Sequence, residues 1–284
     1  MYSLFDIMYN NVVNSFFIYH GIKPDLVSQK VDTKIYRPVD FLGVFAKNAI
    51  YEPSSESTVS IGDIYGCTMN HGDNNDSVFE LLNDYYKEEK PQKKGIFQKS
   101  NDHCNRSNDN LNLSAGAMVE KSNNSPEPIK VCCVDKDNKI YLINDNGMHR
   151  FLAMKSLYLA MLSDNPQLID QIKKKFMVKV QLRELNEVKT FCYYIIKRKQ
   201  KSINKSVGCR LNYQNFFDYD GRLDIGIFDN GKQVDRWVLT DKELLEIAKP
   251  LIEEDLEYYM SIDVPVFKEF MNSIGFGFNP NLNR

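Results

Sequence analysis

The sequence of 284 residues predicts an α+β protein in which a mixed sheet packs against helices. Three observations predict this class. Residues 129–134 and 139–143 are apolar runs that flank a polar turn, as in a β-hairpin. Residues 148–162 are apolar on almost every side, which is typical of a buried helix. Residues 176–182 alternate apolar and polar side chains with a period of two, so a further strand follows.

The N-terminal part is expected to form a helical extension over residues 1–56, because residues 1–20 place apolar side chains near helical spacing. A strand is expected at 58–61. A helix is expected from Ser77 to about Lys87, with Asp76 as its N-cap. Residues 99–126 are rich in Asn and Ser and lack a periodic apolar signal, so they are predicted to be a mobile insertion.

The C-terminal region, residues 186–284, is expected to form a helix, a hairpin and a further helix. Asn186 can cap a helix that runs to about Lys199. Strands are expected at about 222–228 and 234–239, joined at Asp229-Asn230-Gly231. Thr240 can cap a helix from Asp241, which Pro250 could interrupt.

Composition narrows the functional classes. The formal net charge of −2 argues against a protein that coats nucleic acid by bulk electrostatics. The charge is unevenly spread, since residues 171–210 carry twelve Lys or Arg against two acids, and residues 211–284 carry seven against fourteen. This asymmetry predicts either a basic face beside an acidic region or solvated helix faces that differ in sign.

Six scattered Cys and four His show no ligand spacing, so no metal site is expected. The longest apolar runs are far shorter than a membrane span, and the first residues lack the features of a signal peptide. The chain is therefore expected to be cytoplasmic, with reduced thiols and no membrane partner. The oligomeric state is left open.

The turn Gly147-Met148-His149-Arg150 joins a predicted strand to the buried helix. Gly147 can adopt the positive φ that such a turn requires. The free N–H groups of the first helical turn, with the positive end of the helix dipole, form a site for a phosphate. His149 and Arg150 add donors suited to phosphate oxygens. The alternative is an Arg that caps or pairs locally and a His that fills space.

Several segments in order resemble the core of the ParB/sulfiredoxin superfamily over about residues 57–185. They are Pro128-Ile129-x-Val131, Lys139-Ile140-Tyr141-Leu142-Ile143-Asn144, Asn146-Gly147-Met148-His149-Arg150-Phe151-x-Ala153-x-Lys155 and Met177-Val178-Lys179-Val180. The family's strands, its G-x-H-R turn and its following helix match these segments. The opening strand and loop of the family resemble Val59-Ser60-Ile61-Gly62-Asp63-Ile64.

The resemblance implies that Gly147, Met148, His149 and Arg150 hold the phosphates of a nucleotide. Met148 stands where sulfiredoxins place a nucleophilic Cys, so sulfinic acid reduction is not expected. The Arg-rich turn and helix-turn-helix of ParB partition proteins have no counterpart. A nuclease, NTPase or phosphotransferase would also need a carboxylate base or Mg²⁺ ligand. Asp63 is the chosen candidate beside His149, and Asp73, Asp76, Glu80 and Asp145 are alternatives.

A basic segment, Lys197, Arg198, Lys199 and Lys201, follows Tyr193 and Tyr194. It could contact a nucleic-acid backbone and stack bases, or it could be a solvated helix end. Two main functions therefore stand: a nucleotide-dependent enzyme, and a non-catalytic regulator of a plasmid or phage system that senses nucleotide or DNA. A third possibility is a degenerate member that acts only through protein contacts.

Overall fold

The computed structural model describes residues 16–18, 20–37, 42–68, 77–82, 110–133, 139–143, 147–207, 211–217 and 222–277. It is an α+β structure in which the chain forms two compact units. The N-terminal unit comprises Met1–Pro38 and Pro53–Arg183, and the C-terminal unit comprises Val39–Glu52 and Glu184–Arg284. The expected extension over residues 1–56 is therefore not a separate part, because its residues divide between the two units.

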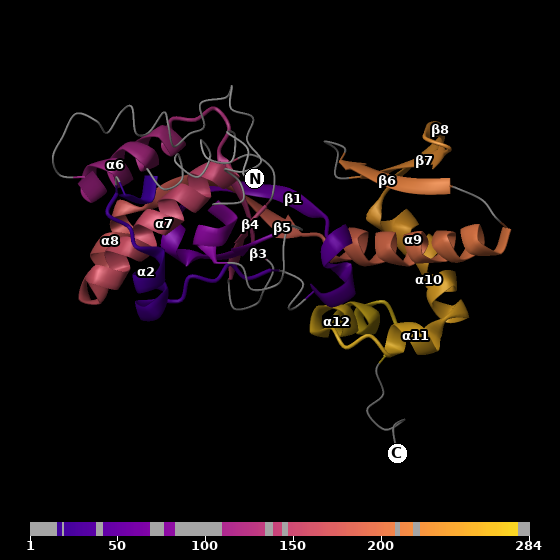
Figure 1. Cartoon of the computed structure of the whole chain (residues 1–284). Coiled ribbons are helices and arrows are strands. Elements are labelled where there is room, and N and C mark those ends of the chain that lie inside the picture. The colour runs from indigo at the N-terminus through magenta and orange to yellow at the C-terminus, as the bar shows by residue number, and fades with distance from the viewer. Residues whose placement is uncertain are drawn as a thin grey trace, which may run out of the picture. The chain divides into compact units, whose positions relative to one another are not determined.

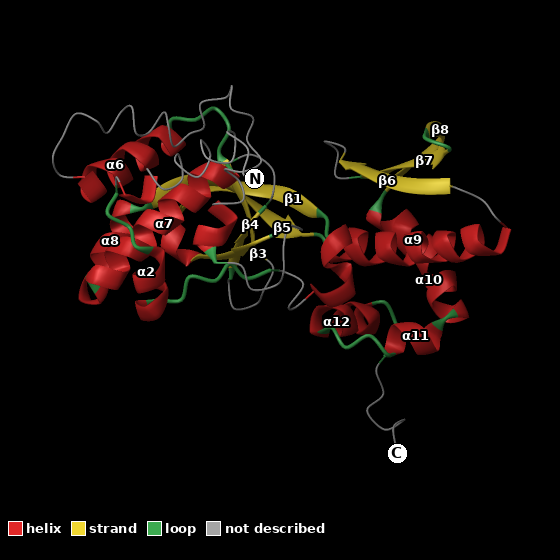
Figure 2. Cartoon of the chain, in the orientation of Figure 1, coloured by secondary structure: helices red, strands yellow, loops and turns green. Residues whose placement is uncertain are grey.

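The N-terminal unit contains a five-stranded mixed sheet with the order β1-β5-β3-β4-β2 (Figures 1 and 2). Its strands are β1 (Tyr51–Ser60), β2 (Ile64–Cys67), β3 (Ile129–Cys133), β4 (Ile140–Leu142) and β5 (Met177–Leu185). β3 pairs antiparallel with β4, as the predicted hairpin requires, and β2 pairs parallel with β4. The first residues of β1 and the last of β5 belong to the C-terminal unit.

Helices α2 (Pro24–Lys30), α6 (Asn110–Asn123), α7 (Met148–Asp164) and α8 (Ile169–Lys175) lie together on one side of this sheet (Figure 1). The predicted buried helix is confirmed as α7, most of whose side chains are buried. It lies at the centre of the core, because few of its positions are polar and neighbouring helices cover its other sides. Two short 3₁₀ helices, η2 (Ile61–Asp63) and η3 (Pro166–Leu168), join these elements.

α6 contradicts the prediction of a mobile insertion for the residues from 110 onward. Its buried side is made of Ala115, Met118 and Ser122, which recur at helical spacing but are small or weakly apolar. Asn123 then ties the end of the helix to β5. Its Oδ1 accepts from the N–H of Lys179 at 2.8 Å, and its Nδ2 donates to the carbonyl of Met177 at 3.3 Å. Residues 99–109 lie outside the described residues.

Part of the predicted N-terminal structure also lies outside the described residues. Of the expected helix over 1–20, residues 16–18 are described and helical. Of the expected helix from Ser77, residues 78–82 are described and helical. Ser77 caps it, since its Oγ accepts from the N–H of Glu80 at 3.2 Å and Glu80 Oε2 accepts from the N–H of Ser77 at 2.7 Å.

The C-terminal unit is built around α9 (Glu187–Val207), which is longer than predicted. η1 (Gly43–Asn48), α10 (Asp241–Glu254), α11 (Leu256–Met260) and α12 (Pro265–Ser273) complete its helices among the described residues. The core is a cluster of aromatic rings in which Phe45, Phe191 and Phe267 contact one another. A residue far upstream, Phe45, is thus packed against the C-terminal helices.

Both predicted helix caps of this unit are confirmed. Asn186 Oδ1 accepts from the N–H of Lys189 at 2.8 Å, and Thr240 forms a capping box with Glu243. Pro250 does not end α10, which continues to Glu254 with Pro250 on its exposed side. The hairpin is confirmed as β7 (Leu223–Asp229) and β8 (Lys232–Leu239), and β6 (Leu211–Phe217) adds a third strand that was not predicted.

Candidate functional site

The N-terminus of α7 begins without a side-chain cap. Gly147 is the N-cap residue, with φ of 103°, so the predicted left-handed turn is confirmed. The first intrahelical hydrogen bond runs from the N–H of Phe151 to the carbonyl of Gly147 at 2.9 Å. The N–H groups of residues 148–150 therefore have no acceptor within the helix, and the positive end of the helix dipole lies at the same place.

A cavity of about 540 Å³ opens at this turn. Its walls come from the end of α6, the segment between α6 and β3, and the start of α7. The residues that line it are Lys121, Asn124, Ser125, Pro126, Glu127, Gly147, His149 and Arg150. Lys121 and Arg150 make its wall cationic, and the side chain of Glu127 is the carboxylate among these residues.

Arg150 carries the main donor of the cavity. Its Nη2 donates to the backbone carbonyl of Glu127 at 2.7 Å, so one side of the guanidinium is anchored. Its Nη1 is buried and has no hydrogen-bond partner among the described residues. Burial lowers the pKa of Arg150, and the charge of Glu127 opposes this. A buried donor without an acceptor is costly, and a small rotation of the side chain toward the cavity would let an anionic oxygen satisfy it.

Gly147 also provides the space that Arg150 occupies. A Cβ atom at this position would lie 3.1 Å from Ile129 Cγ1 and 3.2 Å from Arg150 Nη2. The positive φ therefore favours glycine at this position, and an added Cβ would also crowd Ile129 and the guanidinium of Arg150.

Met148 and His149 differ in their placement. The side chain of Met148 is buried in the core, with 3% of its surface exposed. The side chain of Met148 therefore does not face the cavity, contrary to expectation, because the first apolar position of α7 faces the core. The backbone N–H of Met148 lies at the turn. His149 is half-buried and lines the cavity.

Asp63, the expected catalytic carboxylate, does not line the cavity. It lies in η2 and forms an ion pair with Lys173 of α8 at 2.5 Å. η2 packs against α7 near Tyr158, whose ring leaves no room for a Cβ at Gly62. Tyr158 is eight residues beyond Arg150, which is about 12 Å along a helix. The prediction that Asp63 acts with His149 is therefore not supported by the geometry.

Of the other carboxylate candidates, Glu80 is the one within the described residues. Glu80 forms the helix cap described above, and it does not line the cavity. Asp73, Asp76 and Asp145 lie outside the described residues.

Lys155 is a residue whose role the sequence did not reveal. Its ammonium group is buried and donates hydrogen bonds to the backbone carbonyls of Ile61, Gly62 and Ile64 at 2.9–3.2 Å. Burial is the largest cause that lowers the pKa of Lys155, to about 8. The one feature of the sequence that could have indicated this role is that Lys155 is a lone lysine within the apolar run of α7.

The predicted basic segment lies elsewhere, in the C-terminal unit. Lys197, Arg198, Lys199 and Lys201 line a separate cavity of about 570 Å³ beside α9. Tyr193 is fully buried, so it cannot stack on a base as the sequence suggested. Tyr194 is half-buried, and its hydroxyl lies 2.9 Å from that of Tyr258.

No cluster of three or more potential metal ligands occurs among the described residues. None of the helices in the described ranges is long and apolar enough to cross a membrane. Comparison of the chain with protein-family models, with curated proteins and with solved structures finds no match.

Proposed function

We propose that the chain binds the phosphate groups of a nucleotide at the N-terminus of α7, within a ParB/sulfiredoxin-like domain. The observation that carries this proposal is Arg150, which lines a cavity at an uncapped helix start and whose buried Nη1 lacks a hydrogen-bond partner among the described residues. Backbone N–H groups of a first helical turn together with an arginine are suited to phosphate oxygens.

The contacts of the proposed complex follow from the cavity wall. The backbone N–H groups of Met148 and Arg150 would donate to one phosphate, and the guanidinium of Arg150, turned toward the cavity, would donate to the same or the next one. Lys121, on the last turn of α6, adds a point charge to the lining of the cavity. The order of strands, turn and helix that resembles the ParB/sulfiredoxin superfamily supports a nucleotide over an unrelated anion.

The first candidate function at this site is that of an enzyme, namely a nuclease, an NTPase or a phosphotransferase. His149 is the titratable side chain that lines the cavity near the turn and would act as the acid or base. Mg²⁺ binds to substrate phosphates and one or two carboxylates, and Glu127 is the described carboxylate that fits this role. Such an ion would neutralise phosphate charge.

The second candidate is a regulator that senses a nucleotide or DNA without turnover. The position of Asp63 favours it, because this carboxylate is paired with Lys173 beside η2 and not with the turn. If neither His149 nor Glu127 acts as a base, such a domain would bind and release its ligand unchanged.

Calorimetry of the full chain with ATP, ADP, CTP and GTP, each with Mg²⁺, tests the binding proposal. One nucleotide should bind in the micromolar range, and Arg150→Ala should weaken its binding at least about tenfold, since one charge-assisted hydrogen bond is worth roughly 1.5–3 kcal/mol. Lys174→Ala is the matched control, because Lys174 is an exposed cation of the same unit outside the cavity. Equal weakening in both variants, or no binding by any nucleotide, would refute the proposal.

An assay of phosphate release, with the nucleotide that binds, then distinguishes the enzyme from the regulator. Release that His149→Gln abolishes, with binding retained, would establish the enzyme. Binding without release in the unmodified chain would establish the regulator.

A further inference from the structure

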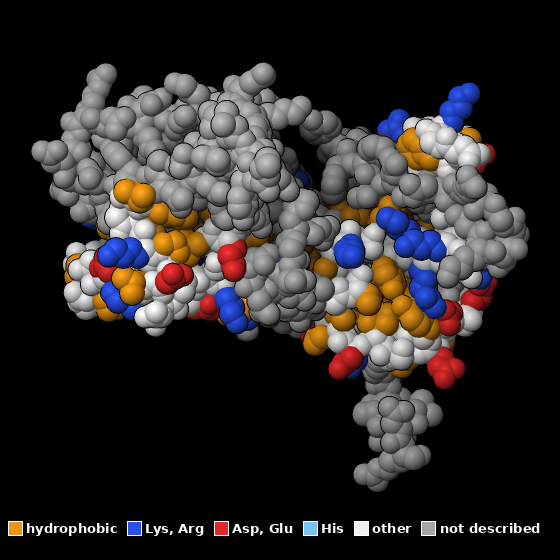
Figure 3. Space-filling view, viewed as in Figure 1, with side chains coloured by type: hydrophobic (Ala, Val, Ile, Leu, Met, Phe, Trp, Pro, Cys, Tyr) orange, Lys and Arg blue, Asp and Glu red, His pale blue; other side chains and the backbone are white. Residues whose placement is uncertain are grey.

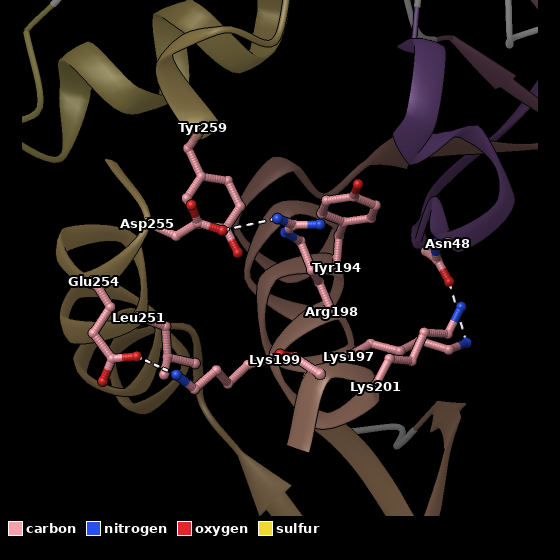
Figure 4. Close-up of a pocket in the computed structure, with 11 residues that line it drawn as sticks. Asn48, Tyr194, Lys197, Arg198, Lys199, Lys201, Leu251, Glu254, Asp255 and Tyr259 are labelled. Atoms are coloured by element: carbon pink, nitrogen blue, oxygen red, sulfur yellow. Dashed lines mark hydrogen bonds and ion pairs between the residues drawn. The ribbon is translucent and has the colours of Figure 1, made fainter. Parts of the chain in front are cut away.

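The basic cavity of the C-terminal unit lies between α9, the end of α10 and η1 (Figure 4). Lys and Arg side chains gather over α9 in the space-filling view (Figure 3). The cations that line the cavity are Lys197, Arg198, Lys199 and Lys201, and the acids are Glu254 and Asp255. Four positive charges thus face two negative ones.

Two of the four cations are neutralised by the end of α10. Arg198 Nη2 pairs with Asp255 Oδ2 at 2.8 Å, and Lys199 pairs with Glu254 (Figure 4). The guanidinium of Arg198 also lies over the ring of Tyr258, 3.4 Å from its centroid, while 38% of the Arg198 side chain stays exposed. One planar face of this cation is therefore held in place by an aromatic ring.

Lys197 and Lys201 have no acidic partner in the described part of the chain. Lys197 Nζ donates to Asn48 Oδ1 at 3.2 Å and lies over the ring of Tyr193, both of which are neutral groups. Burial and then the charge of Lys201 lower the pKa of Lys197. The two lysines are four residues apart on α9, about 6 Å along its axis, so they repel each other at one wall of the cavity.

We infer that this cavity is a second anion site, which takes the backbone phosphates of a single-stranded nucleic acid. A phosphate placed between Lys197 and Lys201 would remove their repulsion and supply the negative charge that the wall lacks. The guanidinium of Arg198 would offer to the neighbouring base the planar face that does not contact Tyr258. The carboxylates of Glu254 and Asp255 bound the site and disfavour a broad polyanion such as a duplex.

This inference is independent of the proposed nucleotide site, since every residue that lines the cavity belongs to the C-terminal unit. Arg150→Ala should leave binding of a strand unchanged. Loss of strand binding in that variant would place the strand at α7 and overturn the inference.

Fluorescence anisotropy of a labelled single-stranded oligonucleotide with the full chain, over a series of salt concentrations, is the test. Lys197→Gln with Lys201→Gln should weaken binding about tenfold at low salt. The slope of log K against log salt should fall by about 0.7 for each phosphate that these lysines neutralise in the unmodified chain. The matched control is Lys232→Gln with Lys249→Gln, which removes the same charge at exposed positions of the same unit outside the cavity.

A second variant tests the inference in the opposite direction. Glu254→Gln removes a negative charge from the site and releases Lys199 from its pair, so it should tighten strand binding about threefold. Heparin and a polyglutamate peptide serve as competitors. Equal loss in the control pair, equal competition by polyglutamate, or no binding of the oligonucleotide would each overturn the inference.

Discussion

The ammonium group of Lys155 donates a 2.9 Å hydrogen bond to the backbone carbonyl of Ile64, across 91 residues of sequence. Two further hydrogen bonds, to the backbone carbonyls of Ile61 and Gly62, complete the set of acceptors around the ammonium group. Only 8% of the surface of Lys155 is exposed. A charge at this depth is tolerated because three carbonyl dipoles replace the lost water. α7 thereby holds η2 and the start of β2 in place.

Lys155→Met is expected to lower the free energy of unfolding at pH 7. It should also remove the rise of this free energy with pH that Lys155 causes. At pH 7 the variant leaves three backbone acceptors without their donor and should lose roughly 2 kcal/mol of the free energy of unfolding. Burial lowers the pKa of Lys155 to about 8 from 10.5. Between these values the unfolded chain binds a proton that the folded chain lacks, so raising the pH stabilises the unmodified protein, by about 3 kcal/mol in total.

The deficit of Lys155→Met should therefore widen between pH 8 and pH 10.5, because the variant lacks this gain. Urea unfolding of both proteins at pH 7 and pH 9.5 measures it. Lys174→Met is the control at an exposed position. A deficit that stays constant across this pH range would mean that the pKa of Lys155 is the same in the folded protein as in the unfolded chain.

Gly147→Ala should destabilise the N-terminal unit by about 1–2 kcal/mol and also weaken nucleotide binding. The backbone at this position has φ of 103°, and the new Cβ would press on Ile129 and on Arg150 Nη2. Thermal unfolding and calorimetry are the measurements. Gly116→Ala is the matched control, since Gly116 is an exposed helical position with nothing within 4 Å of an added Cβ, and it should gain up to about 1 kcal/mol. Unchanged stability of Gly147→Ala would show that the turn is not constrained.

Arg150→Lys distinguishes a bidentate role from a simple charge. A lysine keeps the positive charge, but one ammonium cannot both anchor on the carbonyl of Glu127 and reach an anion in the cavity. Nucleotide affinity should fall by about tenfold, close to the fall in Arg150→Ala. Calorimetry of Arg150→Lys with the nucleotide measures this affinity. An affinity equal to that of the unmodified chain would mean that Arg150 contributes only its positive charge.

The sequence predicted those elements that short-range patterns encode. The hairpin turn Asn230-Gly231 has positive φ at both residues, and Gly147 and the cap Asn186 also occur as expected. These outcomes depend on the local chemistry of a few adjacent residues, which a single sequence displays directly.

The sequence did not predict features that depend on distant contacts. α6 buries small and polar side chains such as Ala115 and Ser122, so no apolar stripe marks it. Asp63 pairs with Lys173, 110 residues away, and thus leaves the turn at Arg150 without it. The full burial of Tyr193 depends on which face of α9 meets the C-terminal core. None of these is visible from residue spacing.

Arg236→Ala should destabilise the C-terminal unit by roughly 1.5–3 kcal/mol. Asp224 of β7 is buried, with 6% of its side chain exposed, and Arg236 Nε donates to both of its carboxylate oxygens at 2.9 and 3.0 Å. The variant leaves that carboxylate buried without this partner, which is the costly half of a broken ion pair. Asp224→Asn in the same background removes the uncompensated charge and should restore part of the loss. Urea unfolding of the two single variants and the double variant gives the coupling energy, and simple additivity of their effects would show that this pair contributes nothing.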